Sequence, residues 1–383
     1  MSEPLQLLDG ILVLDMSQFL SGPFTALRLL DLGARVIKIE RPDGGDLCRR
    51  LYLSDTEIGG DSTLFHAINR GKQSFAADYK NPDDLETVKA LIARADVLVQ
   101  NFRPGVINRL GLDYEAVRKI NPRLVYASIT GYGELGPWVQ RPGQDLLAQA
   151  RSGLMWLNGD DGQGPVPFGL AIADLLAGNA VVQGILAALV RRGISGEGAH
   201  IETSLLEALV DYQFEVLTTY LNDGQRLPKR SEFRNAHAYL AAPYGVYPTA
   251  DSYLALAMMP LDRLAPLLDL PEIAGLGPKA PFLERDRLKR LIADRLLTRT
   301  TDDWVTRLDA ADIWCAKVLN WTELLASDGF RLLDMLQTVT RDDGIAVNTT
   351  RSPLRINGSR ARTERGAPRI GEHSAAIRQE FGL

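Results

Sequence analysis

The stretch that decides the fold is GLAIADLLAGNAVVQGILAALV, from Gly169 to Val190, the most apolar window of the chain. It is long enough to cross a bilayer, and Arg191 and Arg192 follow it as a topology signal would. A spanning helix, however, would hold Asp174 and two side-chain amides in hydrocarbon, which is costly. We therefore interpret the stretch as a buried helix of a globular protein.

Asp174 is the one ionisable residue of this stretch. The opening Gly169 to Ile172 is typical of an extended or turn conformation, which places Asp174 near the start of the helix. Free backbone N–H groups and the helix dipole favour a carboxylate there, so an N-cap aspartate is one explanation. Small and apolar neighbours would partly desolvate the carboxylate, which favours a perturbed pKa and a functional role instead.

The composition is that of a globular protein with an ample core. The 383 residues exceed what one core usually supports, which predicts two domains, and 45% of them are hydrophobic and 24% charged. A net charge of -5 provides no basic surplus for nucleic acid. Cys48 and Cys315 lie far apart, so we expect neither a disulfide framework nor a zinc site. The first residues contain no secretory signal, which predicts a cytoplasmic protein.

Strands and helices alternate in the first third of the chain. Ile11 to Asp15 and Arg35 to Ile39 read as strands that flank a helix over Phe24 to Leu32, which forms a βαβ unit. Further strands over Val97 to Val99 and Leu124 to Ile129 continue the alternation. The pattern predicts an α/β fold with a parallel, Rossmann-like sheet covered by helices.

Residues that suit ligand binding follow the predicted strands. Arg41 comes directly after the second strand, where its guanidinium would hold a phosphate on an adenosine ribose, although a solvated arginine explains it as well. Asn101 to Arg103 lie just past another strand, at the edge where α/β sheets bind ligands. No GxGxxG motif occupies the first turn, so a dinucleotide site has weak support.

The second half of the chain predicts a different unit. Ser204 to Leu221 reads as one long helix, with Ser204 as N-cap and Glu207 completing a capping box. A polar linker follows, and then a hairpin turns at Ala250 to Ser252 ahead of several helices. We expect a large domain from residues 1–221 and 325–383, with a small α+β domain from residues 222–324 between them.

Several motifs occur together in one order. They are LDGILVLDMSQFLSGPF, GARVIKIERPDGGD, NRGKQSFAADYKNP, LVQNFRPGVINRLGLDYE, SITGYGELGP, GQDLLAQARSG and GEHSAA. On these motifs the chain resembles the family III CoA-transferases from end to end. That group includes the formyl-CoA:oxalate and crotonobetainyl-CoA:carnitine transferases and the related α-methylacyl-CoA racemases.

The resemblance implies a site and a reaction. Asp174 matches the family's catalytic aspartate, which attacks an acyl-CoA thioester and passes through a mixed anhydride and an aspartyl-CoA thioester. Coenzyme A and acyl-CoA are then substrates, and no prosthetic group or metal is expected. The resemblance also carries over a set of CoA contacts, which are Leu20, Ser21, Arg41, Ala77, Asp78, Lys80, Asn101, Phe102, Arg103 and Arg109.

Partners follow from the same resemblance. Acyl-CoA and small carboxylates are the expected ligands, and neither nucleic acid nor a membrane is expected. The family's architecture implies an interlocked homodimer whose chain crossings would fall near Leu221 to Glu232 and Leu325 to Thr340. Arg70, Arg151 and Arg234 are candidate anchors for a second carboxylate.

Two departures bear on alternative functions. The racemases have a catalytic histidine at the position of Gln144, and an amide cannot accept an α-proton, which weakens a 2-methylacyl-CoA racemase function. The glycine-rich substrate loop of the formyl-CoA transferases has no equivalent before Tyr244, which puts oxalate and formate in doubt. His237 either borders the acyl pocket or is structural. A non-catalytic CoA-binding protein remains an alternative. A hydrolase is disfavoured, because the chain contains no GxSxG elbow.

Overall fold

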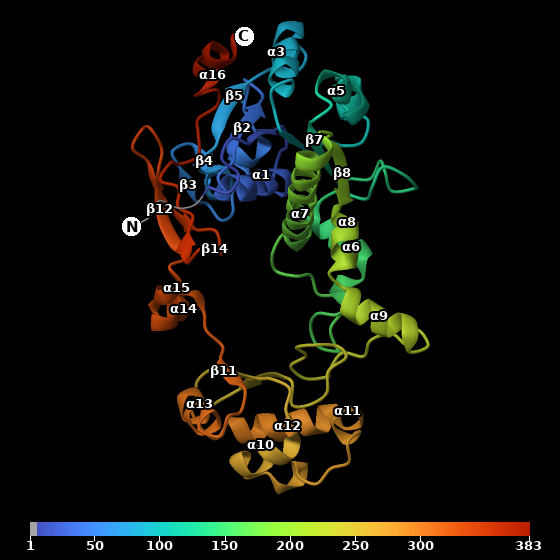
Figure 1. Ribbon diagram of the computed structural model, residues 1–383. Helices are drawn as coiled ribbons and strands as arrows, with labels where there is room; N and C mark the ends of the chain where they lie inside the picture. Colours follow the sequence, from blue (N-terminus) through green and yellow to red (C-terminus); the bar gives the residue numbers. More distant parts are fainter. Residues whose placement is uncertain (1–5) are drawn as a thin grey trace. The chain divides into compact units, whose positions relative to one another are not determined.

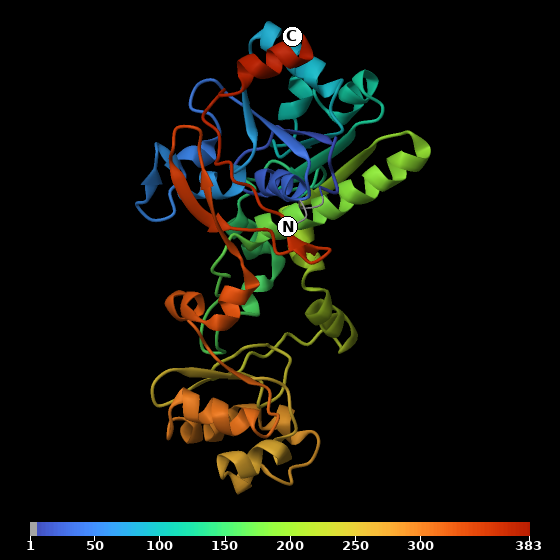
Figure 2. The same cartoon turned by 60° about the vertical axis from the view of Figure 1, so that its left-hand side comes forward.

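The computed structural model describes residues 6–383, and these form two compact units (Figure 1; Figure 2). The first unit contains residues 6–148, Ala171–Asp211 and Leu333–Leu383, so it includes stretches from both halves of the chain. The second contains Gln149–Leu170 and Tyr212–Leu332. The very start of the chain, on which the expectation of a cytoplasmic protein rests in part, lies outside the described residues.

A six-stranded parallel sheet organises the first unit, in the order β5-β2-β1-β6-β7-β8. Its strands are β1 Leu12–Asp15, β2 Arg35–Glu40, β5 Gln73–Ala76, β6 Val97–Gln100, β7 Val125–Thr130 and β8 Ala199–Ser204. Every residue of β1, β6 and β7 is buried, as expected of parallel strands covered on both faces. The predicted α/β class with a parallel sheet is confirmed.

Helices cover both faces of this sheet. Helices α3 (Pro82–Ile92), α5 (Tyr114–Ile120) and α16 (Ser374–Phe381) pack against one face through an apolar core shared with the strands. Helices α1 (Ser21–Asp31) and α7 (Ile172–Ser195) pack together on the other face (Figure 1). The parallel strands all end at one edge of the sheet, and the loops after β1 and β6 diverge there, which is the usual ligand edge of this architecture.

Helix α7 differs from the sequence expectation of a buried helix. Ala173, Ala177 and Gly178 belong to a buried face, whereas Val190 and Ile194 on another face are 70% and 77% exposed. Among residues 6–383 it is the one helix long and apolar enough to cross a membrane, yet 33% of its most apolar window is buried within the protein. Its neighbours α1, α8, β7 and β8 account for that buried face, so it is a half-covered helix of the α/β unit.

The single helix predicted over Ser204 to Leu221 is wrong. The chain instead forms strand β8, then α8 (Leu205–Asp211) and α9 (Phe214–Asn222). Strand β8, which pairs with β7 over six residue pairs, ends at Ser204, and residues 212 and 213 separate the two helices. The Ser204 hydroxyl still accepts from the N–H of Glu207 at 3.1 Å, which is the N-cap half of the predicted capping box.

The second unit is built around a three-stranded antiparallel sheet, β11-β10-β9. Strands β9 (Gly245–Pro248) and β10 (Tyr253–Leu256) form the predicted hairpin, and β11 (Cys315–Lys317) adds an edge that the sequence analysis missed. Its main helices are α10 Leu261–Leu268, α12 Arg285–Leu296 and α13 Thr301–Asp309. They enclose a core in which Trp304 and Tyr247 are fully buried.

Shorter elements complete the two units. The helical ones are η1 Leu47–Arg50, α2 Thr63–Asn69, α4 Val106–Arg109, α6 Asp145–Ser152, η2 Leu154–Trp156, η3 Pro271–Ile273, α11 Ala280–Leu283, α14 Trp321–Ala326 and α15 Asp328–Leu333. The strands are β3 Glu57–Ile58, β4 Asp61–Ser62, β12 Leu336–Thr340, β13 Ala346–Thr350, β14 Arg355–Ile356 and β15 Ser359–Arg360.

A buried ionic cluster lies beneath the carboxyl edge of the sheet. The Lys72 ammonium donates to Asp15 Oδ2 at 2.8 Å, to the carbonyl of Pro23 at 2.8 Å and to Asn69 Oδ1 at 2.9 Å. Burial alone would raise the pKa of Asp15, but the charges of Lys38 and Lys72 outweigh it and lower the pKa to about 2. Asp15 is therefore a permanent buried anion that requires its lysines.

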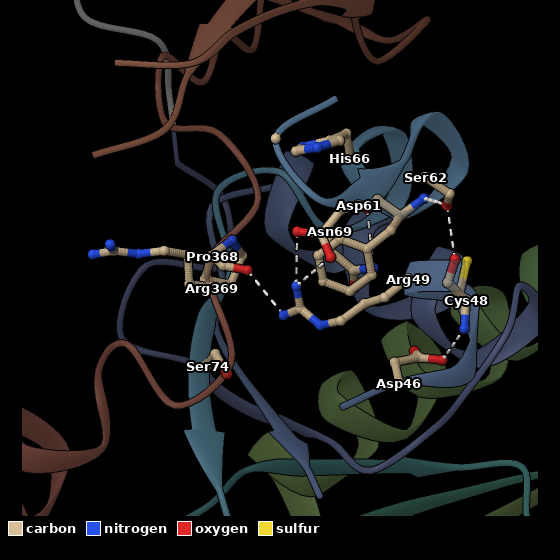
Figure 3. Close-up of polar contacts among 12 residues, drawn as sticks. Asp46, Cys48, Arg49, Asp61, Ser62, His66, Asn69, Ser74, Pro368 and Arg369 are labelled. Carbon is tan, nitrogen blue, oxygen red and sulfur yellow. Dashed lines mark hydrogen bonds and ion pairs between the residues drawn. The ribbon is translucent and has the colours of Figure 1, made fainter. Parts of the chain in front are cut away.

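Arg49 joins distant segments beside this cluster (Figure 3). Its guanidinium forms two hydrogen bonds with Glu40, at 3.0 and 2.7 Å, and two with Asp61, both at 3.0 Å. It also donates to the carbonyl of Pro368 at 2.9 Å and lies 3.8 Å over the Phe65 ring. All five donors are used, so the C-terminal segment is tied to the loop after β2.

Replacing Lys72 with methionine should strongly destabilise the first unit, because Asp15 would lose its closest counter-charge while remaining buried. We expect Lys72→Met to lower the free energy of unfolding by about 3 to 5 kcal/mol. Lys89→Met removes a partly exposed lysine that pairs with Glu86 at 2.8 Å, and should cost less than about 1 kcal/mol. Urea unfolding followed by circular dichroism measures both, and equal losses would contradict a special role for the buried cluster.

Candidate active site

Asp174 lies in the first turn of α7, as the sequence predicted. It is not the N-cap, however, because Ala171 occupies that position without a side-chain cap. The capping carboxylate comes from Asp145, whose Oδ2 accepts from the N–H of Ala173 at 2.6 Å and from that of Asp174 at 3.3 Å. The N-cap explanation of Asp174 is therefore wrong, and its carboxylate is not needed to cap the helix.

The environment of Asp174 raises the pKa of its carboxyl. The residue is half-buried, so the side chain is partly desolvated without being sealed from solvent. Burial, reinforced by the negative charge of Asp145, raises the pKa of Asp174 to about 6, and hydrogen bonds from Ser21 limit the rise. A carboxylate with this pKa is ionised at neutral pH and more basic than an ordinary aspartate.

Close packing of α1 against α7 sets the position of Ser21. A Cβ atom on Gly178 would lie 3.0 Å from the carbonyl oxygen of Ser21 and 2.8 Å from the Phe24 ring, so only glycine fits there. The Thr25 hydroxyl lies 3.0 Å from the Ser21 carbonyl and 3.2 Å from the Gly178 carbonyl. Because Asp174 precedes Gly178 by one helical turn, it shares the face that meets Ser21.

The CoA contacts predicted from sequence gather at the carboxyl edge of the sheet. Leu20 and Ser21 follow β1, Ala77 to Lys80 follow β5, and Asn101 to Arg103 follow β6. Arg41 comes directly after β2, and Arg109 ends α4 nearby in sequence. The strands β5, β2, β1 and β6 are consecutive neighbours in the sheet, so these loops adjoin one another. The arginines and lysine of the set are all exposed: Arg41, Lys80, Arg103 and Arg109.

Other members of the predicted set contact neighbouring residues of the protein. Ala77 is fully buried in the core, and Phe102 packs edge-to-face with Tyr79 at 6.2 Å between ring centroids. The carboxylate of Asp78 accepts from the N–H of Lys80 at 3.0 Å, which shapes the loop after β5. These residues therefore provide shape and backbone groups rather than charge.

The candidate carboxylate anchors fall in different places. Arg70 is 2% exposed and pairs with Asp31 at 2.8 Å, so it cannot reach a substrate, and its proposed anchoring role is wrong. Arg151 and Arg234 are exposed residues of the second unit. His237 also belongs to that unit, where its Nδ1 accepts from the N–H of Tyr239 at 3.2 Å.

Sequence reasoning overlooked Asp145. It belongs to the quoted GQDLLAQARSG motif and directly follows Gln144, but no local pattern connects it with a helix that begins at Ile172. Within residues 6–383, no group of three or more histidine, cysteine, aspartate or glutamate side chains is arranged to hold a metal ion.

A cavity of about 600 Å³ occurs in the second unit, lined in part by Tyr244, Val246, Ala255, Trp314 and Cys315. The lining includes residues of all three strands of the sheet, in which Ala255 pairs with Val246 and with Ala316. The lining is mainly apolar, with Asp309 and Asp312 as its charged members. None of the first-unit residues described above contributes to it.

Comparisons with known proteins show which family the chain resembles. The family model described as CoA-transferase family III matches residues 8–374. The chain is 35% identical to a succinate–glutarate CoA-transferase of Agrobacterium fabrum, covering 98% of this chain and 95% of the relative. It is 34% identical to an acetyl-CoA:oxalate CoA-transferase of Acetobacter aceti, covering 97% and 95%.

A solved structure shares the whole architecture. A CAIB/BAIF family protein from Brucella suis is 33% identical, with a TM-score of 0.85 over 98% of this chain and 99% of that chain. The match extends over the parallel sheet and the α+β unit alike. The chain therefore belongs to CoA-transferase family III and is an enzyme of that class.

Proposed function

We propose that this enzyme transfers CoA from an acyl-CoA to a small organic acid, with Asp174 as the nucleophile. The observation that carries the proposal is a half-buried carboxylate, with its pKa raised to about 6, beside the loops at the ligand edge of the sheet. An ordinary solvated aspartate is a weak nucleophile, whereas partial desolvation makes this one more reactive.

The reaction follows from carboxylate chemistry. An Asp174 oxygen attacks the thioester carbonyl, the C–S bond breaks, and CoA thiolate leaves a mixed anhydride. The thiolate then attacks the aspartyl carbonyl of that anhydride, which releases the first acid and leaves an aspartyl-CoA thioester. The acceptor carboxylate attacks this thioester to give a second anhydride and thiolate. Attack of the thiolate on the acceptor carbonyl forms the new acyl-CoA and restores the Asp174 carboxylate.

Residues at the sheet edge would bind CoA. The exposed basic side chains of Arg41, Lys80, Arg103 and Arg109 supply positive charge for its phosphates, since charge-assisted hydrogen bonds to phosphate are strong. Leu20, Ser21, Ala77, Asp78, Asn101 and Phe102 would contribute loop surface and backbone groups. Water must be kept from the anhydride, and we propose that bound CoA itself closes part of the site.

The acceptor is a proposal at the level of chemical class. The two relatives named above carry glutarate and oxalate in their names, and both are dicarboxylates. We therefore place dicarboxylic acids first in an acceptor screen. A racemase function has less support because Gln144, an exposed amide, replaces the required base. A non-catalytic CoA-binding protein would leave the perturbed carboxyl without a role.

We further propose the family's assembly for this chain. Residues 1–221 and 325–383 would form the large CoA-binding domain and residues 222–324 the small domain of an interlocked homodimer in the cytoplasm. The compact units differ from these bounds, since Gln149–Leu170 and residues 212–221 and 325–332 cluster with the second unit. The exposed apolar residues Val190 and Ile194 of α7 are consistent with a covering partner.

Acyl-CoA should label Asp174 covalently. Incubation with donor acyl-CoA in the absence of acceptor, followed by peptide mass spectrometry, should detect a CoA adduct on the peptide that contains Asp174. Asp174→Asn should abolish the adduct and reduce kcat by at least about a thousandfold, since nucleophile loss removes the covalent pathway. Asp211→Asn, at the exposed end of α8, is the control. An adduct on another residue would overturn the assignment.

The same carboxyl should make stability depend on pH. Folding raises its pKa from the ordinary 3.8 to about 6, so the folded state holds this proton more tightly than the unfolded chain. The carboxylate therefore costs stability as pH rises through that interval, and the full cost is present above it. Asp174→Asn should raise the unfolding midpoint relative to the wild type at about pH 8 and not at about pH 4. An equal difference at both pH values would contradict the shifted pKa.

Arg41 should recognise the phosphate on the CoA ribose. Loss of one charge-assisted hydrogen bond corresponds to about a tenfold change in affinity. We expect Arg41→Gln to weaken binding of CoA by about that factor and binding of 3′-dephospho-CoA much less. Arg94→Gln, exposed at the opposite edge of the sheet between α3 and β6, is the matched control. Calorimetric titration measures the affinity for both ligands. Equal losses of affinity for CoA and 3′-dephospho-CoA would show that Arg41 contacts another part of CoA.

A further inference from the structure

Three polar side chains form a hydrogen-bonded chain across neighbouring strands of the parallel sheet. They belong to Gln100 at the end of β6, Ser128 on β7 and His200 on β8. Gln100 Nε2 lies 3.0 Å from Ser128 Oγ, and Ser128 Oγ lies 2.9 Å from His200 Nε2. Gln100 pairs with Ser128, which pairs in turn with Glu202, two residues after His200. Because side chains alternate along a strand, all three lie on one face of the sheet.

The chain of hydrogen bonds ends at the loop after β6. Gln100 Oε1 accepts from the backbone N–H of Phe102 at 2.8 Å. Phe102 is the middle residue of the loop that we assign to the CoA surface. Gln100 and Ser128 are each 3% exposed, so solvent does not replace these contacts when they are lost.

The Phe102 N–H determines the direction of every hydrogen bond in this chain. A backbone N–H can donate but not accept, so the oxygen of Gln100 faces Phe102 and its Nε2 faces Ser128. Since Gln100 Nε2 donates to Ser128 Oγ, the serine hydroxyl proton is available to His200 Nε2. His200 Nε2 is then an acceptor, which requires the neutral imidazole with its proton on Nδ1.

Aromatic rings hold His200 in the orientation that this contact needs. Its ring stacks on Tyr114 of α5, with 4.7 Å between the ring centroids. It also meets Tyr126 of β7 edge-to-face at 5.2 Å. Helix α7 covers the opposite face of β8, where a Cβ atom on Gly184 would lie 2.6 Å from Ile201 Cγ2.

Carboxylates supply the charges around His200. Its Nδ1 lies 3.5 Å from Glu202 Oε2 on the same strand, and its side chain is 24% exposed. Burial lowers the pKa of His200 below its ordinary value of 6.5, although Glu202, Glu134 and Glu115 act in the opposite direction. The neutral ring is therefore the main form at neutral pH, and it becomes charged as the pH falls below about 6.5.

We propose that His200 is a positioning residue for the CoA-binding loop after β6, and that its neutral form favours CoA binding. The inference rests on the proposed function, because it takes this loop as part of the CoA surface. A charged His200 would turn Nε2 into a donor, so two N–H groups would point at Ser128 Oγ. The buried serine hydroxyl would lose its acceptor, which disfavours the arrangement in which Gln100 holds the Phe102 N–H.

CoA affinity should follow the titration of His200. Between about pH 8 and about pH 5.5, we expect the Kd for CoA to rise about fivefold more in the wild type than in His200→Gln. The glutamine keeps an acceptor for Ser128 without titrating. His200→Phe keeps a stacked ring but no acceptor, so its Kd should be raised at both pH values. Asp174 and the CoA phosphates titrate in all three proteins, so the difference isolates His200.

The coupling can also be observed without CoA. The chain has four histidines, so the ring resonances of His200 can be assigned with His200→Gln. In protein labelled with ¹⁵N-phenylalanine, the amide resonance of Phe102 should shift with the midpoint of the His200 titration. Ser128→Ala interrupts the chain but leaves His200 in place, and it should abolish that shift, as should His200→Gln. A Phe102 amide that does not titrate in the wild type, or titrates equally in Ser128→Ala, would overturn the proposal.

His237 provides the matched control. Its side chain is 23% exposed, and its Nε2 lies 3.8 Å from Glu215 Oε1, so it too is a partly exposed histidine beside a glutamate. It belongs to the second unit, away from the strands that carry the chain. His237→Gln should therefore keep the pH dependence of the wild type. If it reduced that dependence as much as His200→Gln, the effect would be one of surface charge and the proposal would fail.

The two measurements separate failure of this inference from failure of the proposed function. If Arg103→Gln left CoA affinity unchanged, the proposed CoA surface would fail at this loop. The titration of the Phe102 amide needs neither CoA nor turnover. It would then still decide whether the protonation of His200 reaches the loop after β6.

Discussion

The buried pairing of Asp15 with Lys72 and Lys38 is the constraint on which the functional edge of this enzyme depends. An unpaired charge in the interior would cost several kcal/mol, so the elements that carry these groups must close together. Lys72 also holds the carbonyl of Pro23 in the first turn of α1. Lys38 donates to the carbonyl of Ser17 at 2.9 Å in the loop before it. The ionic cluster thereby fixes the backbone on both sides of Ser21.

Two aspartates at this edge have different pKa values because their surroundings differ. Asp15 is buried among cations, which keep it ionised with a pKa near 2. Asp174 is only half-buried, but its charged neighbour is the carboxylate of Asp145, and its pKa rises to about 6. The first arrangement produces a structural anion, whereas the second produces a group that suits covalent catalysis.

The family assignment identifies the class of reaction, which is CoA transfer. It does not identify the acids that take part. The relatives from Agrobacterium fabrum and Acetobacter aceti are almost equally similar to this chain, yet their names carry different dicarboxylic acids. The CoA-facing residues proposed here recognise a moiety common to all such substrates. Selection of the acid must therefore lie with residues outside this set, among which Arg151 and Arg234 remain candidates.

The sequence by itself determined the elements whose signals are local. Apolar strand runs, the βαβ alternation, the hairpin around Ala250 to Ser252 and the position of Asp174 at a helix start all follow from short-range periodicity and turn chemistry. Shared motifs then indicated the family. Tertiary structure alone decided the rest. Strand β8 forms because β7 lies beside it, and Asp145 caps a helix that begins far along the chain. Arg70 forms a buried ion pair with Asp31. Asn101 likewise bonds to the backbone of Gln18 only because two loops meet at the sheet edge. No local pattern encodes which distant group a side chain will find.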